Sequence, residues 1–322
     1  DSPDRIAAPD PLARECGIIL AGYPNSIISP LSLETGLQIT RSDEGFIELK
    51  LPGTSSLLRI ILTPYANETR LRTFLGFEDN ESELHSLLQK KWQQIADLYC
   101  DQSGVNILMT HLFMIKKGEE GKLEEPEEEK PILHVGGLQA IYAENVPEQL
   151  QYVALGHLHR KQVVAKSPCP MVYSSSPLAY SFAEADQDKY AIIVEAQPGK
   201  TIAHRAVKLK SGRRLLRQAF EDIDTAEQWL QKNPDTFVEL TLATETYLSQ
   251  EDRKRLNQAH DGIVAIIPQV KSQETSEKSG APKVNLDKSM EDLFIDYFRH
   301  KNDGQPPDEA LKKLFKEVLA DS

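Results

Sequence analysis

The sequence predicts an α/β protein with two or three folding units, and three observations lead to this prediction. The chain has 322 residues, which exceeds the usual size of a single domain. Through residues 1–197, short apolar runs of strand length alternate with segments that have helical periodicity. A shorter alternation of the same kind follows in residues 198–271. Strands separated by helices or long loops are typical of layered α/β folds with ligand-binding loops at strand ends.

The first block, residues 1–197, begins with a helix and continues with strands. Ser2-Pro3-Asp4 places a capping hydroxyl before a proline at the first helical position. The turn residues 52–55 separate two apolar runs, 45–51 and 56–62, and this arrangement predicts an antiparallel hairpin. Apolar residues at helical spacing predict a helix over 81–99. Further strands are predicted at 105–110, 151–155 and 189–196.

The second block, residues 198–271, predicts a small α/β cap domain with three strands and two helices. The strands are expected at 201–209, 237–243 and 262–270, and the helices at 225–233 and 249–259. A unit of about 70 residues is near the lower size at which one core suffices. Residues 272–285 are polar and contain Gly and Pro, so they predict a linker.

The last segment, residues 286–322, predicts a pair of short amphipathic helices. About 35 residues cannot bury so much aromatic and aliphatic surface among themselves. A partner surface is therefore favoured, and packing back onto the body of the protein is the alternative. The residues expected to carry this contact are Leu293, Phe294, Tyr297, Leu311, Leu314 and Phe315.

Composition and charge exclude several classes of protein. The formal net charge of −12 argues against binding nucleic acid over the whole surface, although a local basic face remains possible. No apolar run reaches the ~18–20 residues of a membrane-spanning helix, and the first residues lack a signal-peptide pattern. The three cysteines are far apart, which argues against a disulfide scaffold or a thiolate zinc site. We therefore expect a cytoplasmic protein.

Three histidines follow predicted core strands. His111 ends the run 105–110, and His157 follows the run 151–155, with His159 two positions further. Side chains at i and i+2 of an extended backbone point the same way, so His157 and His159 could converge on metal. Parallel strands that end at one sheet edge would also bring His111 to His157. The alternative is three unrelated, solvated histidines; the repeated placement favours metal ligands.

These motifs resemble those of the calcineurin-like metallophosphoesterases, and within that family the SbcD-type nuclease subunits. Thr110-His111 is similar to one metal motif, and Gly156-His157-Leu158-His159 matches the G-H-x-H motif. The segments 130–137, 154–160 and 172–189 carry the resemblance to the nuclease subunits, which covers essentially the whole chain. The resemblance implies a layered β-sandwich flanked by helices, a small cap domain and a C-terminal helical pair.

The resemblance also implies a site for two divalent ions, normally Mn²⁺, with Mg²⁺ as an alternative. His111 and His157 would bind one ion, and His159 the other. Asp1 would be the last residue of an upstream Gly-Asn-His-Asp motif and would orient its missing histidine. The sequence contains no D-x-H or G-N-H motif, so we expect the N-terminal metal motifs to be lacking. We therefore expect this chain to bind manganese weakly and to cleave no DNA, and the full-length protein to do both.

A basic run lies between residues 197 and 220, which include no acidic residue. One interpretation is contact with DNA phosphates, and the other is a solvated strand face followed by a basic loop. The resemblance favours DNA. The residues expected to bind it are Lys208, Lys210, Arg213, Arg214 and Arg217.

The function implied is that of a Mn²⁺-dependent DNA endo- and exonuclease subunit, acting at DNA ends and hairpins in repair and recombination. Its partner would be an SbcC-like ATPase, gripped at its coiled-coil base by the C-terminal helices, and it would form a homodimer when full length. Two alternatives remain open. One is another metallophosphoesterase, such as a nucleotide or protein phosphatase. The other is a non-catalytic scaffold that binds the ATPase.

Overall fold

The computed structural model describes residues 3–65, 84–118, 141–185, 187–244 and 248–270, and in the C-terminal region 293–295, 298, 307, 311–312 and 315. Asp1, Tyr297, Leu314 and the predicted linker 272–285 lie outside these residues. The chain divides into two compact units, Asp1–Val270 and Lys271–Ser322. Within the described ranges, no helix has the length and apolar character needed to cross a membrane.

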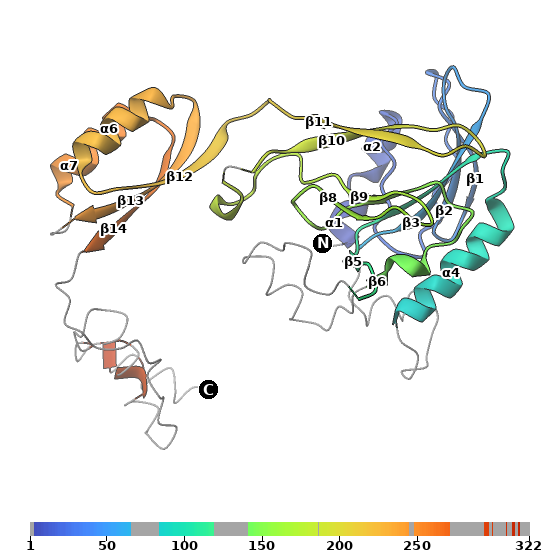
Figure 1. Cartoon of the computed structure of the whole chain (residues 1–322), viewed down its shortest axis with the longest axis horizontal. Helices are drawn as coiled ribbons and strands as arrows, with labels where there is room; N and C mark the ends of the chain where they lie inside the picture. Colours follow the sequence, from blue (N-terminus) through green and yellow to red (C-terminus); the bar gives the residue numbers. More distant parts are fainter. Residues whose placement is uncertain are drawn as a thin grey trace. The chain divides into compact units, whose positions relative to one another are not determined.

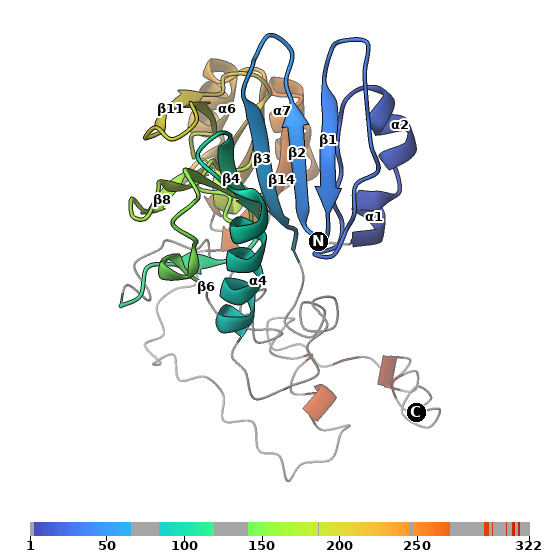
Figure 2. The same cartoon turned by 90° about the vertical axis from the view of Figure 1, so that its right-hand side faces the viewer.

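A seven-stranded mixed sheet forms the centre of the first unit, in the order β1-β2-β3-β4-β7-β9-β8 (Figures 1 and 2). Neighbouring strands from β3 to β9 run parallel, and the strands at both edges are antiparallel. The hairpin predicted over 45–62 is confirmed as β2 and β3. The strands are β1 Gln38–Asp43, β2 Phe46–Lys50, β3 Leu57–Thr63, β4 Val105–Thr110, β7 Tyr152–Leu155, β8 Gln162–Ala165 and β9 Met171–Tyr173.

Helix α4 (Leu84–Tyr99) covers one face of this sheet, as its apolar periodicity predicts (Figure 2). Leu88 and Trp92 are almost fully buried and belong to the same core as Leu108 and Val153 of the sheet. The indole Nε1 of Trp92 donates a hydrogen bond of 2.9 Å to the Thr63 hydroxyl. The polar atom of the largest buried side chain is therefore satisfied where β3 ends.

The opposite face of the sheet packs against a two-stranded antiparallel ribbon of β10 (Tyr190–Glu195) and β11 (Ala203–Lys208). Ile192 and Val194 of β10 contact a small core that includes Tyr152 and Val172. Helix, sheet and ribbon are thus stacked in layers, and the predicted α/β class is confirmed. The remaining elements of this region are α1 Pro3–Ala7, α2 Asp10–Glu15, β5 Met114–Ile115, β6 Ile141–Tyr142, η1 Ala143–Asn145 and η2 Phe182–Glu184.

A three-stranded parallel sheet with two helices on one face forms the predicted small α/β domain (Figure 1). Both predicted helices are present, and each begins at a capped residue. Asp222 accepts a hydrogen bond from the Thr225 amide, and Ser249 forms a capping box with Asp252. The elements are β12 Arg214–Phe220, α6 Ile223–Lys232, β13 Thr236–Thr244, α7 Gln250–Ala259 and β14 Ile263–Val270.

The first strand of this domain differs from the prediction. The run 201–209 contributes β11, which pairs with β10, and the segment interpreted as a basic loop forms β12. The reason is burial: every residue of β11 is exposed, whereas Leu216 of β12 is buried. Only β12 therefore has an apolar side chain that the helices can cover. The boundary at 197/198 between the two predicted blocks falls within the β10–β11 ribbon.

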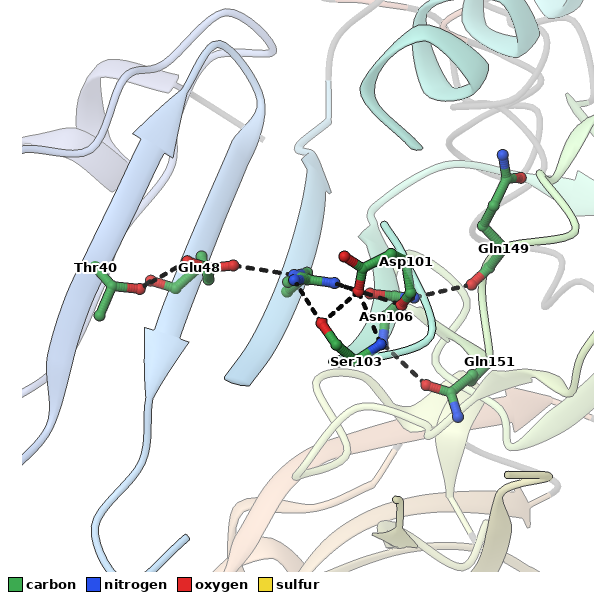
Figure 3. A network of polar contacts seen from close by, with 8 residues as sticks. Thr40, Glu48, Asp101, Ser103, Asn106, Gln149 and Gln151 are labelled. Carbon is green, nitrogen blue, oxygen red and sulfur yellow. Dashed lines mark hydrogen bonds and ion pairs between the residues drawn. The ribbon is translucent and has the colours of Figure 1, made fainter. Parts of the chain in front are cut away.

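A polar network crosses the sheet at the beginning of β4 (Figure 3). The buried guanidinium of Arg59 contacts Glu48 Oε2 at 3.0 Å and Asp101 Oδ1 at 2.6 Å. Thr40 donates to the other oxygen of Glu48, and the Asn106 side-chain amide donates to the carbonyl of Asp101. This network around a buried cation with two carboxylate partners links β1, β2, β3 and β4, at the end of β4 opposite to His111.

In the second unit, the two predicted helical segments touch through aromatic rings. Phe294 stacks on Phe315 with centroids 4.1 Å apart, and it also approaches Phe298 at 6.1 Å. Leu293, Phe294, Leu311 and Phe315 are all partly buried. Pairwise stacking thus covers part of the apolar surface that the sequence predicts for this segment.

Candidate metal centre

His111 and His157 meet at the carboxyl edge of the sheet, on neighbouring parallel strands. His111 directly follows β4, and His157 comes two residues after β7, with Thr110 and Leu155 paired in register. The amide of Gly156 donates to the Thr110 carbonyl at 2.9 Å, and the amide of His111 donates to the Thr63 carbonyl at 3.0 Å. The two imidazole centroids are 5.5 Å apart. The strand-end placement seen in the sequence thus corresponds to real proximity.

The backbone between β7 and His157 is shaped to admit both rings. A Cβ atom at Gly156 would lie 2.8 Å from His111 Nδ1, a distance that real Cβ atoms essentially never show. His157 itself has φ +102°, in the left-handed region that side chains rarely occupy. The chain therefore turns sharply after β7, and glycine is required at the point of closest approach.

Tyr65 follows the third neighbouring strand, β3, and contributes a ring to the same edge. Its centroid is 6.0 Å from that of His111 and 5.9 Å from that of His157, with which it is stacked. Sequence reasoning missed this residue, although it comes three positions after the predicted strand 56–62 and two after β3 as observed. Tyrosine is common at strand ends, so its type alone gives no functional signal.

Burial keeps both of these histidines neutral. Desolvation lowers the pKa of His111 to about 4. Desolvation, followed by the charges of His111 and His159, lowers the pKa of His157 to about 4. A neutral imidazole with a free lone pair is the form that binds metal.

His159 lies in a different environment, held by a carboxylate. Its Nδ1 is 2.8 Å from Glu184 Oε1, and its ring centroid is 5.4 Å from that of Tyr180. The other oxygen of Glu184 contacts the ammonium of Lys189 at 2.5 Å. Burial acts to raise the pKa of Glu184, but hydrogen bonds from Lys189 and His159 lower it below its ordinary value.

Glu184 and Lys189 were not predicted as site residues. They lie in the segment 172–189, which carried part of the family resemblance, but a single carboxylate in a polar loop has no periodicity that could reveal burial. The structure shows it: only 4% of the Glu184 side chain and 8% of the Lys189 side chain are exposed. The signal available in the sequence was the resemblance itself.

The donor set fits part of a metal site. Imidazole nitrogen suits divalent transition ions. The set of three histidines includes no cysteine thiolate, which would favour a softer metal. In the part of the chain that the structure describes, no group of three or more His, Cys, Asp or Glu side chains is arranged to hold a metal ion. Asp1, which the resemblance assigns to orienting a missing histidine and not to the metal, lies outside that part. The histidines therefore fit as an incomplete ligand set.

The predicted DNA-binding residues are close together, but carboxylates from other elements balance some of their charge. Lys208 pairs with Asp188 at 2.6 Å, and Arg217 pairs with Glu239 at 2.5 Å. A cavity of about 280 Å³ lies between this run and the segment that carries Glu184 and Lys189. The basic residues that line it are Lys189, Lys208, Lys210, Arg213 and Arg214.

Arg213 illustrates why sequence alone overstates the charge of this run. Its guanidinium lies 2.9 Å from Asp235 and 3.5 Å from Asp261, and it stacks over the ring of Phe237. These partners follow it by more than 20 residues in the sequence. The run between 197 and 220 is therefore free of acidic residues, whereas its folded surroundings are not.

A mixed α/β sheet with histidines after neighbouring parallel strands, layered as above, defines the chain as a protein of the metallophosphoesterase type. No protein-family model matches it. The SbcD subunit of the nuclease SbcCD from Bacillus subtilis (strain 168) is 32% identical over 326 residues, which cover 99% of this chain and 76% of that protein. The chain belongs to the SbcD family of SbcCD nuclease subunits, which confirms the resemblance seen in its motifs.

Two further SbcD proteins match shorter stretches. The protein of Escherichia coli (strain K12) is 29% identical over 127 residues, which cover 38% of this chain and 31% of that protein. The protein of Staphylococcus epidermidis (strain ATCC 12228 / FDA PCI 1200) is 25% identical over 205 residues, or 63% of this chain and 51% of that protein. The family assignment therefore rests on the Bacillus match, and these two agree with it.

Proposed function

We propose that the chain corresponds to a large part of the nuclease subunit of an SbcCD-type complex, which in its full-length form hydrolyses phosphodiester bonds of DNA during repair and recombination. The observation that carries this proposal is the meeting of His111 and His157 at the sheet edge, in a chain whose relatives are named as nuclease subunits. The reaction is endo- and exonucleolytic, at DNA ends and hairpins, and it depends on Mn²⁺, for which Mg²⁺ can substitute.

The three histidines are divided between two ions. His111 and His157 would hold one ion through neutral imidazoles, and His159 would hold the other through Nε2, since its Nδ1 is engaged by Glu184. A pair of divalent ions, when bound, activates a water molecule and neutralises charge that develops on the phosphodiester oxygens. Asp1 orients a histidine that this sequence does not contain. Residues 1–322 alone bind manganese weakly, cleave no DNA, and act as a scaffold.

Calorimetric titration of Mn²⁺ into residues 1–322 tests the ligand set. We expect weak binding that His111→Ala or His157→Ala weakens further. The control His85→Ala, on helix α4 beside Tyr142, leaves it unchanged. Two tight Mn²⁺ sites in this chain would contradict the incomplete ligand set, and unchanged binding in the histidine variants would contradict the site itself.

The basic run contacts the DNA backbone without reading its sequence. Lys208, Lys210, Arg213, Arg214 and Arg217 lie on β11, on β12 or between them. Replacing Arg213 and Arg214 together with Glu is expected to lower DNA affinity and to reduce its dependence on salt, because fewer counterions are released. The control Lys90→Glu reverses a charge on α4, away from the run. Unchanged affinity of the Arg213/Arg214 variant at low salt would remove this role.

The C-terminal helical pair binds the SbcC-like ATPase through its aromatic face. The stack of Phe294 on Phe315 provides a surface for a coiled coil. Phe294→Asp together with Phe315→Asp is expected to abolish co-purification with the ATPase, and Lys312→Asp serves as a charge control on the same segment. Retained co-purification of the double variant would place the contact elsewhere. A homodimer through the N-terminal half of the full-length protein is checked by sedimentation.

A further inference from the structure

We propose that Glu184, Lys189 and Ser176 form a positioning cluster that fixes His159 in one tautomer. In this tautomer the proton is on Nδ1, and the lone pair that would bind a metal ion is on Nε2. The inference rests on the proposed metal site, and it concerns residues that have no role there as ligands. A buried ion pair, Glu184 with Lys189, then determines how the His159 ring is oriented and which of its nitrogens carries the proton. The two residues of this pair lie 25 to 30 positions further along the chain.

The carboxylate determines where the proton is. Glu184 Oε1 lies 2.8 Å from His159 Nδ1, and the Glu184 side chain is only 4% exposed. An ionised carboxylate can only accept hydrogen bonds, so a neutral His159 must donate from Nδ1. The lone pair is then on Nε2, the only other ring nitrogen. A carboxylate on the far nitrogen of a metal-binding histidine also raises its basicity as a ligand.

Lys189 keeps the carboxylate ionised and in place. Its Nζ lies 2.5 Å from Glu184 Oε2, 2.9 Å from Ser176 Oγ and 3.1 Å from the carbonyl oxygen of His159 itself. These three acceptors match the three N–H donors of an ammonium group. One cation therefore holds both the main chain of His159 and the carboxylate that contacts its ring.

Ser176 accepts a hydrogen bond from Lys189 and helps to determine which group donates in each hydrogen bond of the cluster. Its hydroxyl donates to the Leu178 carbonyl at 2.7 Å, so its oxygen is available to accept from Lys189. Glu184, Lys189 and Ser176 are all buried, and each of these contacts has one donor and one acceptor. A reversal of one hydrogen bond would leave a buried group unsatisfied, which proteins avoid.

This geometry makes an unusual prediction for Glu184→Gln, a change that preserves the shape of the side chain. Lys189 only donates, so it retains the Gln carbonyl oxygen at the position of Oε2. The amide NH₂ is then directed at His159 Nδ1 and must donate to it. The ring proton moves to Nε2, and the lone pair proposed to bind metal is lost. The variant is thus expected to invert the tautomer rather than release the ring.

Nuclear magnetic resonance of the whole chain with ¹⁵N-labelled histidine tests this inference without metal. At a pH near 8, long-range ¹H–¹⁵N correlations distinguish the two tautomers, and His159→Asn identifies the signals of His159. We expect the Nδ1–H form in the wild type and in Glu184→Asp, and the Nε2–H form in Glu184→Gln. Removing the cation as well, in Glu184→Gln with Lys189→Met, lets the amide turn and restores the Nδ1–H form.

Two controls separate the inference from general disturbance and from the proposed function. Glu195→Gln, on the ribbon strand β10, makes the same chemical change outside the cluster and is expected to leave the tautomer unchanged. An Nε2–H wild type, or a tautomer indifferent to Glu184→Gln, would overturn the inference. Circular dichroism establishes whether each variant folds. If another variant does not fold, Glu184→Asp, which keeps the carboxylate, still tests whether His159 carries its proton on Nδ1.

Broadening of the His159 signals by paramagnetic Mn²⁺ provides the second measurement, and it works for weak binding. Glu184→Gln is expected to require about tenfold or more Mn²⁺ for the same broadening, the usual effect of losing a partner of a metal ligand. The predicted tautomers without any Mn²⁺ effect at His159 would contradict the proposed metal site and leave the tautomer assignment intact.

Discussion

Gly156 lies so close to His111 that a Cβ atom at position 156 would stand 2.8 Å from the imidazole Nδ1. The amide of the same glycine is hydrogen-bonded to Thr110, so the backbone cannot move away without breaking the pairing of β4 with β7. The position of the His111 ring is therefore set by the absence of a side chain on the neighbouring strand.

Gly156→Ala is expected to displace the His111 ring and to weaken Mn²⁺ binding by about tenfold, as in other disturbances around metal ligands. Calorimetry or Mn²⁺-induced broadening of the His111 signals measures the effect. Gly104→Ala is a matched control at the other end of the sheet, where the new Cβ would lie 3.0 Å from the Arg59 guanidinium. Equal Mn²⁺ affinity in both variants would show that the close packing of Gly156 against the His111 ring does not determine Mn²⁺ binding.

The metal-free chain is expected to lose stability between pH 6.5 and pH 4. Burial lowers the pKa of His111 and of His157 to about 4, whereas imidazole in an unfolded chain titrates near ~6.5. The unfolded state binds more protons in this window, so the free energy of unfolding decreases as the pH falls through it and is at its full value above it. Each histidine contributes on the order of 1–3 kcal/mol.

Urea unfolding at several pH values, with a chelator present, measures this dependence. His111→Gln is expected to flatten the profile, because the group that takes up the proton on unfolding is removed. His204→Gln, on the exposed strand β11, is expected to keep the wild-type slope. A profile that is the same in all three proteins would show that the buried imidazoles are not its cause.

Loss of Glu48 is expected to destabilise the sheet by roughly 3 kcal/mol, since it removes one partner of a buried ion pair with Arg59. The hydrogen bond from Arg59 also lowers the pKa of Asp101, but this carboxylate is 67% exposed and is screened by solvent. Asp101→Asn should therefore cost less than Glu48→Ala. Urea unfolding of the two variants tests the ranking, which equal losses would refute.

Asp235→Asn is expected to tighten DNA binding about twofold, because it removes a carboxylate that competes with phosphate for Arg213, and such surface pairs contribute ~0.5 kcal/mol. Fluorescence anisotropy at low salt measures the change. Asp224→Asn, which removes one of the two carboxylate partners of Arg255 on helices α6 and α7, is the matched control, since Arg213 also has a second partner in Asp261. If both substitutions change affinity equally, the effect reflects net charge and not the basic run.

The sequence predicted the parts of the fold in which one residue pattern decides the outcome. Helix α4, the hairpin of β2 and β3, and the core strand β4 have clear apolar periodicity, and all were predicted. Strands β8 and β9 have only three or four residues each, too few for a pattern to emerge. The run 201–209 has strand periodicity, but its pairing with β10 depends on which surface is left uncovered.

The site residues, too, could be predicted only where a local pattern in the sequence marks them. His111 and His157 were found because strand ends can be read from the sequence and parallel strands share an edge. Glu184 and Lys189 could not be found this way, because their burial results from the folding of the whole loop after β9 around His159. The partners of Arg213 were missed for the same reason, since Asp235 and Asp261 come from later turns of the chain.

The backbone conformation of His157 lowers the folding stability of the chain. A non-glycine residue at φ +102° carries a conformational cost of about 1–3 kcal/mol that no metal contact removes. His157→Gly should therefore unfold at higher urea concentration than His157→Ala, although both lack the imidazole. Glycine at this position would avoid that cost, so the imidazole of His157 is held at the sheet edge at the expense of folding stability.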